Sequence, residues 1–389
     1  MRVIGLAAVF SLVLGAAAAS ETKLRIGYLE VERPAPPVLS NLDAVPEDLG
    51  LAGARLGLSD NATTGRFLGQ TYTMSEVLVP EGGDAIAAAR ALLASSRAIV
   101  LDASAEVLTA IADLPEAQGA LLFNATAPDA VLRDTDCRAN LLHTISSDAM
   151  RADALAQFLV QRRWTDVALI KGGHPRDLAF AAALRASAGK FRLKLVGEKT
   201  WVFDADMRRN ASAEVPLFTQ DFRDHDVLLI ADEIGDFGRY VVYNTWLPRP
   251  VAGSEELVPQ AWAPVVEQWG AAQLQSRFED QAGREMAPED YAAWAALRAL
   301  GEAVTRTGSD DVAVLRAYML SGDFELAGFK GRPLSFRPWN GQLRQPIPIV
   351  TDRAVVATAP LEGFFHQGNE LDTLGRDAPE SACRAFEEH

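Results

Sequence analysis

Short apolar runs alternate with amphipathic segments of about ten residues along most of this chain, and this alternation restricts the folds open to it. In the first part of the chain, strand-like apolar runs and helical patterns follow one another at 24–28, 49–67, 72–79, 84–93, 98–101, 108–114 and 120–123. Such an order predicts a parallel sheet whose two faces are covered by helices.

The same kind of unit begins again after residues 143–148. Strands are expected at 167–170, 195–203, 227–231 and 250–252, with helices at 150–161, 177–188 and 289–307. Three later runs, 334–336, 348–350 and 354–358, are typical of antiparallel strands, joined by a turn at Asn340-Gly341. Since domains usually hold about 100–200 residues, we expect two α/β lobes. Ligands bind at the carboxyl ends of such strands, so two facing lobes predict a cleft that closes on a small ligand.

The first nineteen residues have the pattern of a cleaved signal peptide. Arg2 is a basic start, Val3 to Leu14 is apolar, and Ala17 to Ala19 offers a small-residue cleavage site. The apolar stretch is short and rich in alanine, whereas a membrane-spanning helix needs about 20 strongly apolar residues. No cysteine follows it that could carry a lipid. We therefore expect export, with residues 1–19 removed and the rest placed in a bacterial periplasm.

The net charge limits the classes of partner this chain can bind, and its cysteine content predicts a disulfide. The formal net charge is -15, which argues against nucleic acid and against docking on anionic lipid. The chain has two cysteines, Cys137 and Cys383, and an oxidising compartment favours one disulfide between them over two free thiols.

Motifs for catalysis and metal binding are missing from the sequence. It contains no G-x-S-x-G elbow, no H-E-x-x-H pair, no P-loop and no calcium-loop spacing. Acidic residues gather in two runs, interpreted as solvated surface: Asp204, Asp206, Asp221, Asp224 and Asp226. We expect no enzymatic activity, no cofactor and no metal site.

Several stretches, taken together, resemble the type I periplasmic binding proteins of branched-chain amino acid ABC importers. They are Asn124–Pro128 (NATAP), His143–Asp148 (HTISSD), Trp164–Ile170 (WTDVALI), Tyr291–Asp311 and Leu334–Leu343 (LSFRPWNGQL). The resemblance implies two doubly wound parallel-sheet lobes, joined by a hinge with crossings near Ser147, Ala263 and Ala327. Lobe 1 would then hold 20–147 with 264–327, and lobe 2 would hold 148–263 with 328–389. It also implies a monomer that closes on its ligand like a Venus flytrap and docks on an ABC permease in the inner membrane.

A narrower resemblance concerns Cys137–Thr144 (CRANLLHT) and Arg151–Leu155 (RADAL). Both look like the branch of this family that is encoded beside PQQ-dependent alcohol dehydrogenase systems. The ligand stays open between PQQ, a metal chelate, an alcohol-derived compound and an amino acid. A sensor that signals to a receptor or regulatory partner is the alternative to transport.

The resemblance also implies where an amino acid would bind. Small residues after two strands of the first lobe would hold its carboxylate: Ala103, Ser104, Ala125 and Thr126. On the second lobe, Glu255 falls where the family binds the ammonium group, and Asp232, Glu233 and Asp236 follow a strand at the cleft. The alternative is that these residues are ordinary caps and solvated loop acids.

Two loops depart from the family pattern. The loop after the first strand is the Pro-rich 32–38, without the family's aromatic residue. The loop after the first strand of the second lobe carries Lys171, His174 and Arg176, which favour an anionic ligand such as PQQ unless they form a solvated rim.

Overall fold

The computed structural model describes residues 21–34, 45–202 and 207–387, so the expected signal peptide lies outside the described residues. The first lobe is built on a five-stranded parallel sheet in the order β2-β1-β3-β4-β5. Its strands are β1 (Thr22–Val31), β2 (Gln70–Val79), β3 (Ala98–Asp102), β4 (Leu121–Asn124) and β5 (Leu141–His143). Within the described residues, no helix is long and apolar enough to cross a membrane.

Side chains that alternate along these strands build a separate core on each face of the first sheet. Ile26, Val100 and Phe123 pack on one face, whereas Leu29 and Leu101 pack on the other. The first face is covered by α1 (Leu51–Leu68), α8 (Ala271–Ala282), α9 (Pro288–Thr307) and α10 (Val312–Met319), and the second by α2 (Ala85–Leu93) and α3 (Ala105–Ala112).

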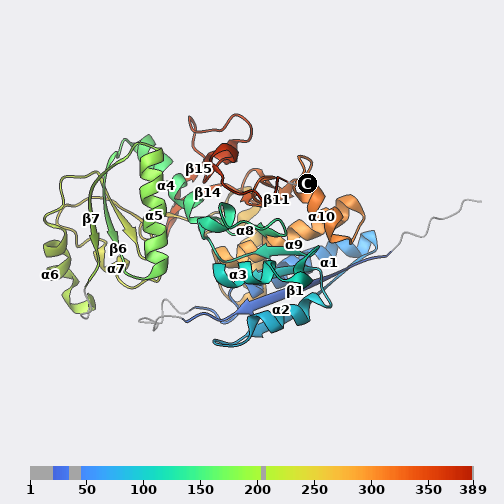
Figure 1. Ribbon diagram of the computed structural model, residues 1–389. Helices are drawn as coiled ribbons and strands as arrows, with labels where there is room; N and C mark the ends of the chain where they lie inside the picture. The colour runs from blue at the N-terminus through green and yellow to red at the C-terminus, as the bar shows by residue number, and fades with distance from the viewer. Residues whose placement is uncertain (1–20, 35–44, 203–206, 388–389) are drawn as a thin grey trace, which may run out of the picture.

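The second lobe contains a four-stranded parallel sheet in the order β7-β6-β8-β9. Its strands are β6 (Asp166–Lys171), β7 (Lys194–Thr200), β8 (Val227–Ala231) and β9 (Val251–Gly253). One face packs on α4 (Asp148–Arg162) and α5 (Pro175–Lys190), and the other on α6 (Met207–Thr219) and α7 (Gly238–Val241). Figure 1 shows this lobe standing apart from the first, with α4, β14 and β15 between them. The expected α/β fold class is confirmed.

Two short antiparallel sheets complete the fold. β10 (Val258–Pro259), β14 (Ile347–Thr351) and β15 (Ala354–Ala359) form one of them, and β11 (Leu326–Ala327), β12 (Pro333–Phe336) and β13 (Leu343–Arg344) form another. Short 3-10 turns occur at Pro115–Ala117, Ala130–Arg133, Gln268–Gly270, Glu370–Thr373 and Ala378–Glu380.

The turn at Asn340-Gly341 joins different strands from those expected. It connects β12 to β13, while β14 pairs with β15 in the other small sheet. Burial explains the difference, because Phe336 and Leu343 enter the core of the first lobe and Ile349 enters that of the second. These contacts favour a third crossing after Arg344, later than the expected Ala327; the lobe boundaries remain a proposal.

The predicted disulfide is confirmed. Cys137 and Cys383 are bonded, with 5.6 Å between their Cα atoms, and both lie in the core of the first lobe. Phe386 of the tail joins the same core. The disulfide therefore fixes the C-terminal tail to the first lobe.

Candidate functional site

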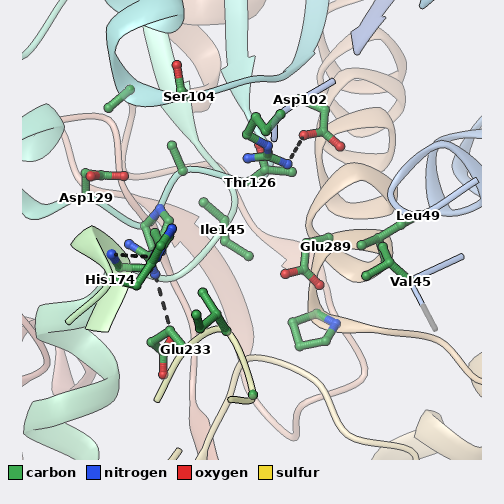
Figure 2. A pocket seen from close by; sticks show the side chains of 18 of the residues that line it. Val45, Leu49, Asp102, Ser104, Thr126, Asp129, Ile145, His174, Glu233 and Glu289 are labelled. Atoms are coloured by element: carbon green, nitrogen blue, oxygen red, sulfur yellow. Dashed lines mark hydrogen bonds and ion pairs between the residues drawn. The ribbon is translucent and has the colours of Figure 1, made fainter. Parts of the chain in front are cut away.

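A cavity of about 950 Å³ lies between the two lobes. Residues at the carboxyl ends of β1, β3 and β4 line one side, and the loops after β6 and β8 line the other. Figure 2 shows Asp102 and Glu289 on one side of it, and His174 and Glu233 on another. Parallel strands end at the same edge of their sheet, so both lobes present their loops to this space.

Carboxylates dominate the wall formed by the first lobe. Asp102, the last residue of β3, is buried, and its Oδ1 lies 2.8 Å from Nη2 of Arg33. Burial raises the pKa of Asp102, although the Arg33 guanidinium opposes this shift. Burial and the neighbouring Asp102 charge raise the pKa of Glu30, on β1, to about 7. Burial also raises the pKa of Glu289, near the start of α9.

The second-lobe wall carries a network of two arginines and two carboxylates. The Arg151 guanidinium on α4 lies 2.5 Å from Glu233 and 3.3 Å from Asp148. Arg176 on α5 lies 3.2 Å from Asp148 and 3.6 Å from Glu233. Burial alone would raise the pKa of Glu233, but Arg151, Ser254 and Arg176 outweigh burial and hold it below its usual range. The four charges compensate one another within the wall.

Six of the residues expected to bind ligand line this cavity: Ser104, Thr126, His174, Arg176, Glu233 and Asp236. Most of their side chains already have structural partners. Ser104 caps α3 by accepting a hydrogen bond from the backbone of Val107, and His174 caps α5 through its Nδ1. The charge of Arg176 is shared with the acidic residues of the second-lobe network.

Three of the backbone N–H groups expected to hold a carboxylate are occupied inside the protein. The Ala103 N–H donates to Thr126 Oγ1 at 3.2 Å, and the Ala125 N–H donates to the carbonyl oxygen of Leu101. The Thr126 N–H donates to Asn124 Oδ1 at 3.1 Å. Ala103 and Ala125 are fully buried and do not line the cavity.

Three further residues of the expected site lie outside the cavity lining. Lys171 pairs with Glu198 at 2.5 Å. Asp232 is buried and accepts hydrogen bonds from three backbone N–H groups at the start of α7. Glu255 packs against that helix, since a Cβ at Gly238 would lie 2.7 Å from its Cγ. These three side chains contact other residues of the second lobe, and their role in ligand binding stays a prediction.

Sequence reasoning missed Glu30, Asp102, Arg151 and Glu289. A signal was present for Asp102, because it directly follows the apolar run 98–101 and therefore had to emerge at the carboxyl edge of the sheet. Glu289 gave no such signal, because α9 reaches the cavity only through the folding of the whole lobe.

The acidic runs are interpreted from the sequence as solvated surface, and we expect no metal site there. Among the described residues, no group of three or more His, Cys, Asp and Glu side chains could hold a metal ion. Asp204 and Asp206 lie outside the described residues, as do residues 35–38 of the Pro-rich loop.

The fold is that of type I periplasmic binding proteins. A branched-chain amino acid ABC transporter periplasmic ligand-binding protein from Burkholderia xenovorans matches with a TM-score of 0.71 and 15% identity, over 93% of this chain and 100% of that one. The leucine-, isoleucine-, valine-, threonine- and alanine-binding protein of Brucella ovis matches with a TM-score of 0.67 and 16% identity, over 89% of this chain and 92% of that one. An ABC transporter solute-binding protein from R. palustris, in complex with benzoate, matches with a TM-score of 0.63 and 13% identity, over 93% of this chain and 99% of that one.

Each of these neighbours is a binding protein, and none is an enzyme. No protein-family model matches this chain, and no curated protein matches it.

Proposed function

We propose that this chain is the periplasmic solute-binding component of an ABC transporter and captures a small ligand between its lobes. The observation that carries the proposal is the cavity of about 950 Å³ whose walls come from opposite lobes. A ligand that touches both walls binds the closed protein more tightly than the open one, so binding drives closure. The ABC transporter binding proteins of the same fold and the signal-peptide pattern support transport from the periplasm, with an inner-membrane permease as partner and a monomer as the working form.

A link to PQQ-dependent alcohol oxidation is the finer part of the proposal. It is supported by the likeness of Cys137–Thr144 and Arg151–Leu155 to the branch encoded beside such systems. The link does not require PQQ as the ligand. PQQ carries several carboxylates, and the cavity lining holds more carboxylates than arginines, so an alcohol-derived compound suits the site better.

The experiment is a thermal-shift screen of the mature protein against small amino acids, aromatic acids, alcohols, amines and PQQ, followed by small-angle X-ray scattering with each binder. We expect at least one solute to raise the melting temperature and lower the radius of gyration. Ala105→Trp places a large ring in the cavity and should abolish the response. Ala110→Trp, on an exposed position of the same helix, is the matched control and should leave it intact. A screen in which no solute changes either quantity would contradict the proposal.

A further inference from the structure

Charge is unevenly distributed between the two walls of the cavity. Its lining contains seven carboxylates and four arginines. The first lobe contributes five of these acids and one of the arginines: Glu30, Glu32, Asp102, Asp129, Glu289 and Arg33. The second lobe contributes Arg151, Arg176 and Arg239 against Glu233 and Asp236. The excess of negative charge therefore lies on the first-lobe wall.

Two of the first-lobe acids lack a counter-charge of their own. Glu30 and Glu289 form no ion pair with another described residue, although both are partly removed from solvent. Asp102 has Arg33 as its one ion-pair partner among the described residues. Withdrawing a carboxylate from water costs free energy, and burial raises the pKa of all three acids, that of Asp102 despite its pairing with Arg33. A positive group placed between them would remove this cost.

A buried hydroxyl beside these acids also lacks a partner. Tyr28 is 1% exposed, and its Oη makes no hydrogen bond within the described part of the chain. A Cβ at Gly50 would lie 2.7 Å from this Oη and 3.3 Å from Asp102 Oδ2, so both oxygens flank the same point. Buried polar groups are rarely left unpaired, and this one stands at the edge of the acidic wall.

Apolar side chains separate the carboxylates. Figure 2 shows Glu289 beside Leu49 and Val45, with Ile145 between this side and the second-lobe residues. The acids themselves come from three elements, β1, β3 and α9. A bare metal ion needs oxygens converging on one point, whereas an organic ammonium group carries methyl or methylene groups that fill apolar space between spaced carboxylates.

We propose that the ligand is an organic cation, whose ammonium group lies against the first-lobe wall formed by Glu30, Asp102 and Glu289. The inference rests on the proposed function and names the ligand class of the same cavity. It reverses the polarity that the family resemblance implied, in which the first lobe held the ligand's anionic end and Glu255 of the second lobe held its cation. The occupied N–H groups at Ala103 and Thr126 support the reversal.

The test compares ligands of the same shape and different charge by calorimetric titration of the unmodified mature protein. Choline and putrescine are the cationic probes, and 3,3-dimethyl-1-butanol is the uncharged isostere of choline. We expect saturable binding of at least one cationic probe. If choline is that probe, its isostere should bind at least about tenfold more weakly, as loss of an interaction with a charged group implies.

Substitutions then locate the positive group. Glu30→Gln and Glu289→Gln should each weaken the bound cation by at least about tenfold. Asp236→Asn removes the same charge from the second-lobe wall and should change affinity less than about threefold. Circular dichroism confirms that each variant is folded, and the isostere comparison needs no variant at all. Equal weakening by all three substitutions would overturn the assignment to the first-lobe wall.

Other outcomes separate this inference from the proposed function. Binding of leucine, benzoate or PQQ with no response to either cation would overturn the cationic ligand and leave the solute-binding proposal standing. If neither choline nor putrescine binds in the calorimetric titration, the inference is overturned as well, whatever the wider thermal-shift screen finds. Only a screen without any binder would contradict the proposed function itself.

Discussion

Replacing Glu233 by glutamine removes one of the two carboxylates that face Arg151 and Arg176 on the second-lobe wall. The Arg151–Glu233 contact is bidentate, with N–O distances of 2.5 and 3.1 Å. The exposed fractions of the two side chains are 15% for Arg151 and 11% for Glu233. Water therefore screens this pair weakly, and the variant leaves an arginine poorly compensated.

The size of the effect follows from what remains around Arg151. Breaking a fully buried pair costs about 3–5 kcal/mol. Here Arg151 keeps Asp148 at 3.3 Å and the carbonyl oxygen of Pro259 at 3.0 Å. The glutamine also keeps one acceptor oxygen for Arg151. We therefore expect Glu233→Gln to lower the free energy of unfolding of the second lobe by about 2–3 kcal/mol.

Urea unfolding followed by circular dichroism measures this change, with a separate transition fitted for each lobe. The control is Glu76→Gln, which breaks an Arg55–Glu76 pair of similar geometry whose side chains are 47% and 35% exposed. It should cost at most about 1 kcal/mol, since solvent screens exposed pairs. The Glu233 pKa is held below its usual range, so the stabilisation is complete above the ordinary glutamate pKa and is lost as the pH falls through the folded value.

A loss below about 0.5 kcal/mol at neutral pH, no larger than that of the control, would refute the reasoning, because Glu233 would then be no more important than an exposed acid. A double-mutant cycle with Arg151→Met isolates the pairwise coupling, which should exceed about 1 kcal/mol.

Three further measurements follow from the structure. Replacing both Cys137 and Cys383 by serine should lower the free energy of unfolding by about 2–5 kcal/mol, because the disulfide joins residues 246 positions apart in the sequence. Denaturant unfolding of the oxidised and the reduced wild-type protein measures the same loss. Gly53→Ala should lower the free energy of unfolding by at least about 2 kcal/mol, since its Cβ would lie 1.9 Å from a backbone oxygen of α9. In Gly189→Ala the new Cβ meets nothing within 4 Å, so this control should be neutral or slightly stabilising in the same assay. If an organic cation binds at the first-lobe wall, its affinity should rise about tenfold between pH 6 and 8, because Glu30, with a pKa of about 7, loses its proton in this range. An affinity that does not change with pH, or the same rise in Glu30→Gln, would contradict this prediction.

The strand and helix pattern was largely readable from the sequence. Buried parallel strands are continuous apolar runs, so β3 and β8 were found almost to the residue. The helices α6, α7, α8 and α10 were missed. Polar residues are frequent in α6 and α8, so few large apolar residues are left to mark a buried stripe on these two in the sequence. The three-residue strand β5 was missed for a similar reason: it is too short for an apolar run to mark it.

The site was only partly predictable. Strand ends placed Ser104 and Thr126 at the cavity, because parallel strands must deliver their carboxyl ends to one edge. Whether a backbone N–H is free to bind a ligand depends on its neighbours. Oxygen atoms of Thr126, Asn124 and Leu101 accept hydrogen bonds from three of the four N–H groups expected to be available.

By itself, the sequence determined two α/β units and one disulfide, since apolar periodicity and cysteine content are local or compositional properties. Only the tertiary structure decided the charge of the cavity. Arg151 and Glu233 are 82 residues apart in the sequence, and Glu289, later still in the chain, lines the same cavity. Charges act through distance in space, so their balance at a site exists only once the chain has folded.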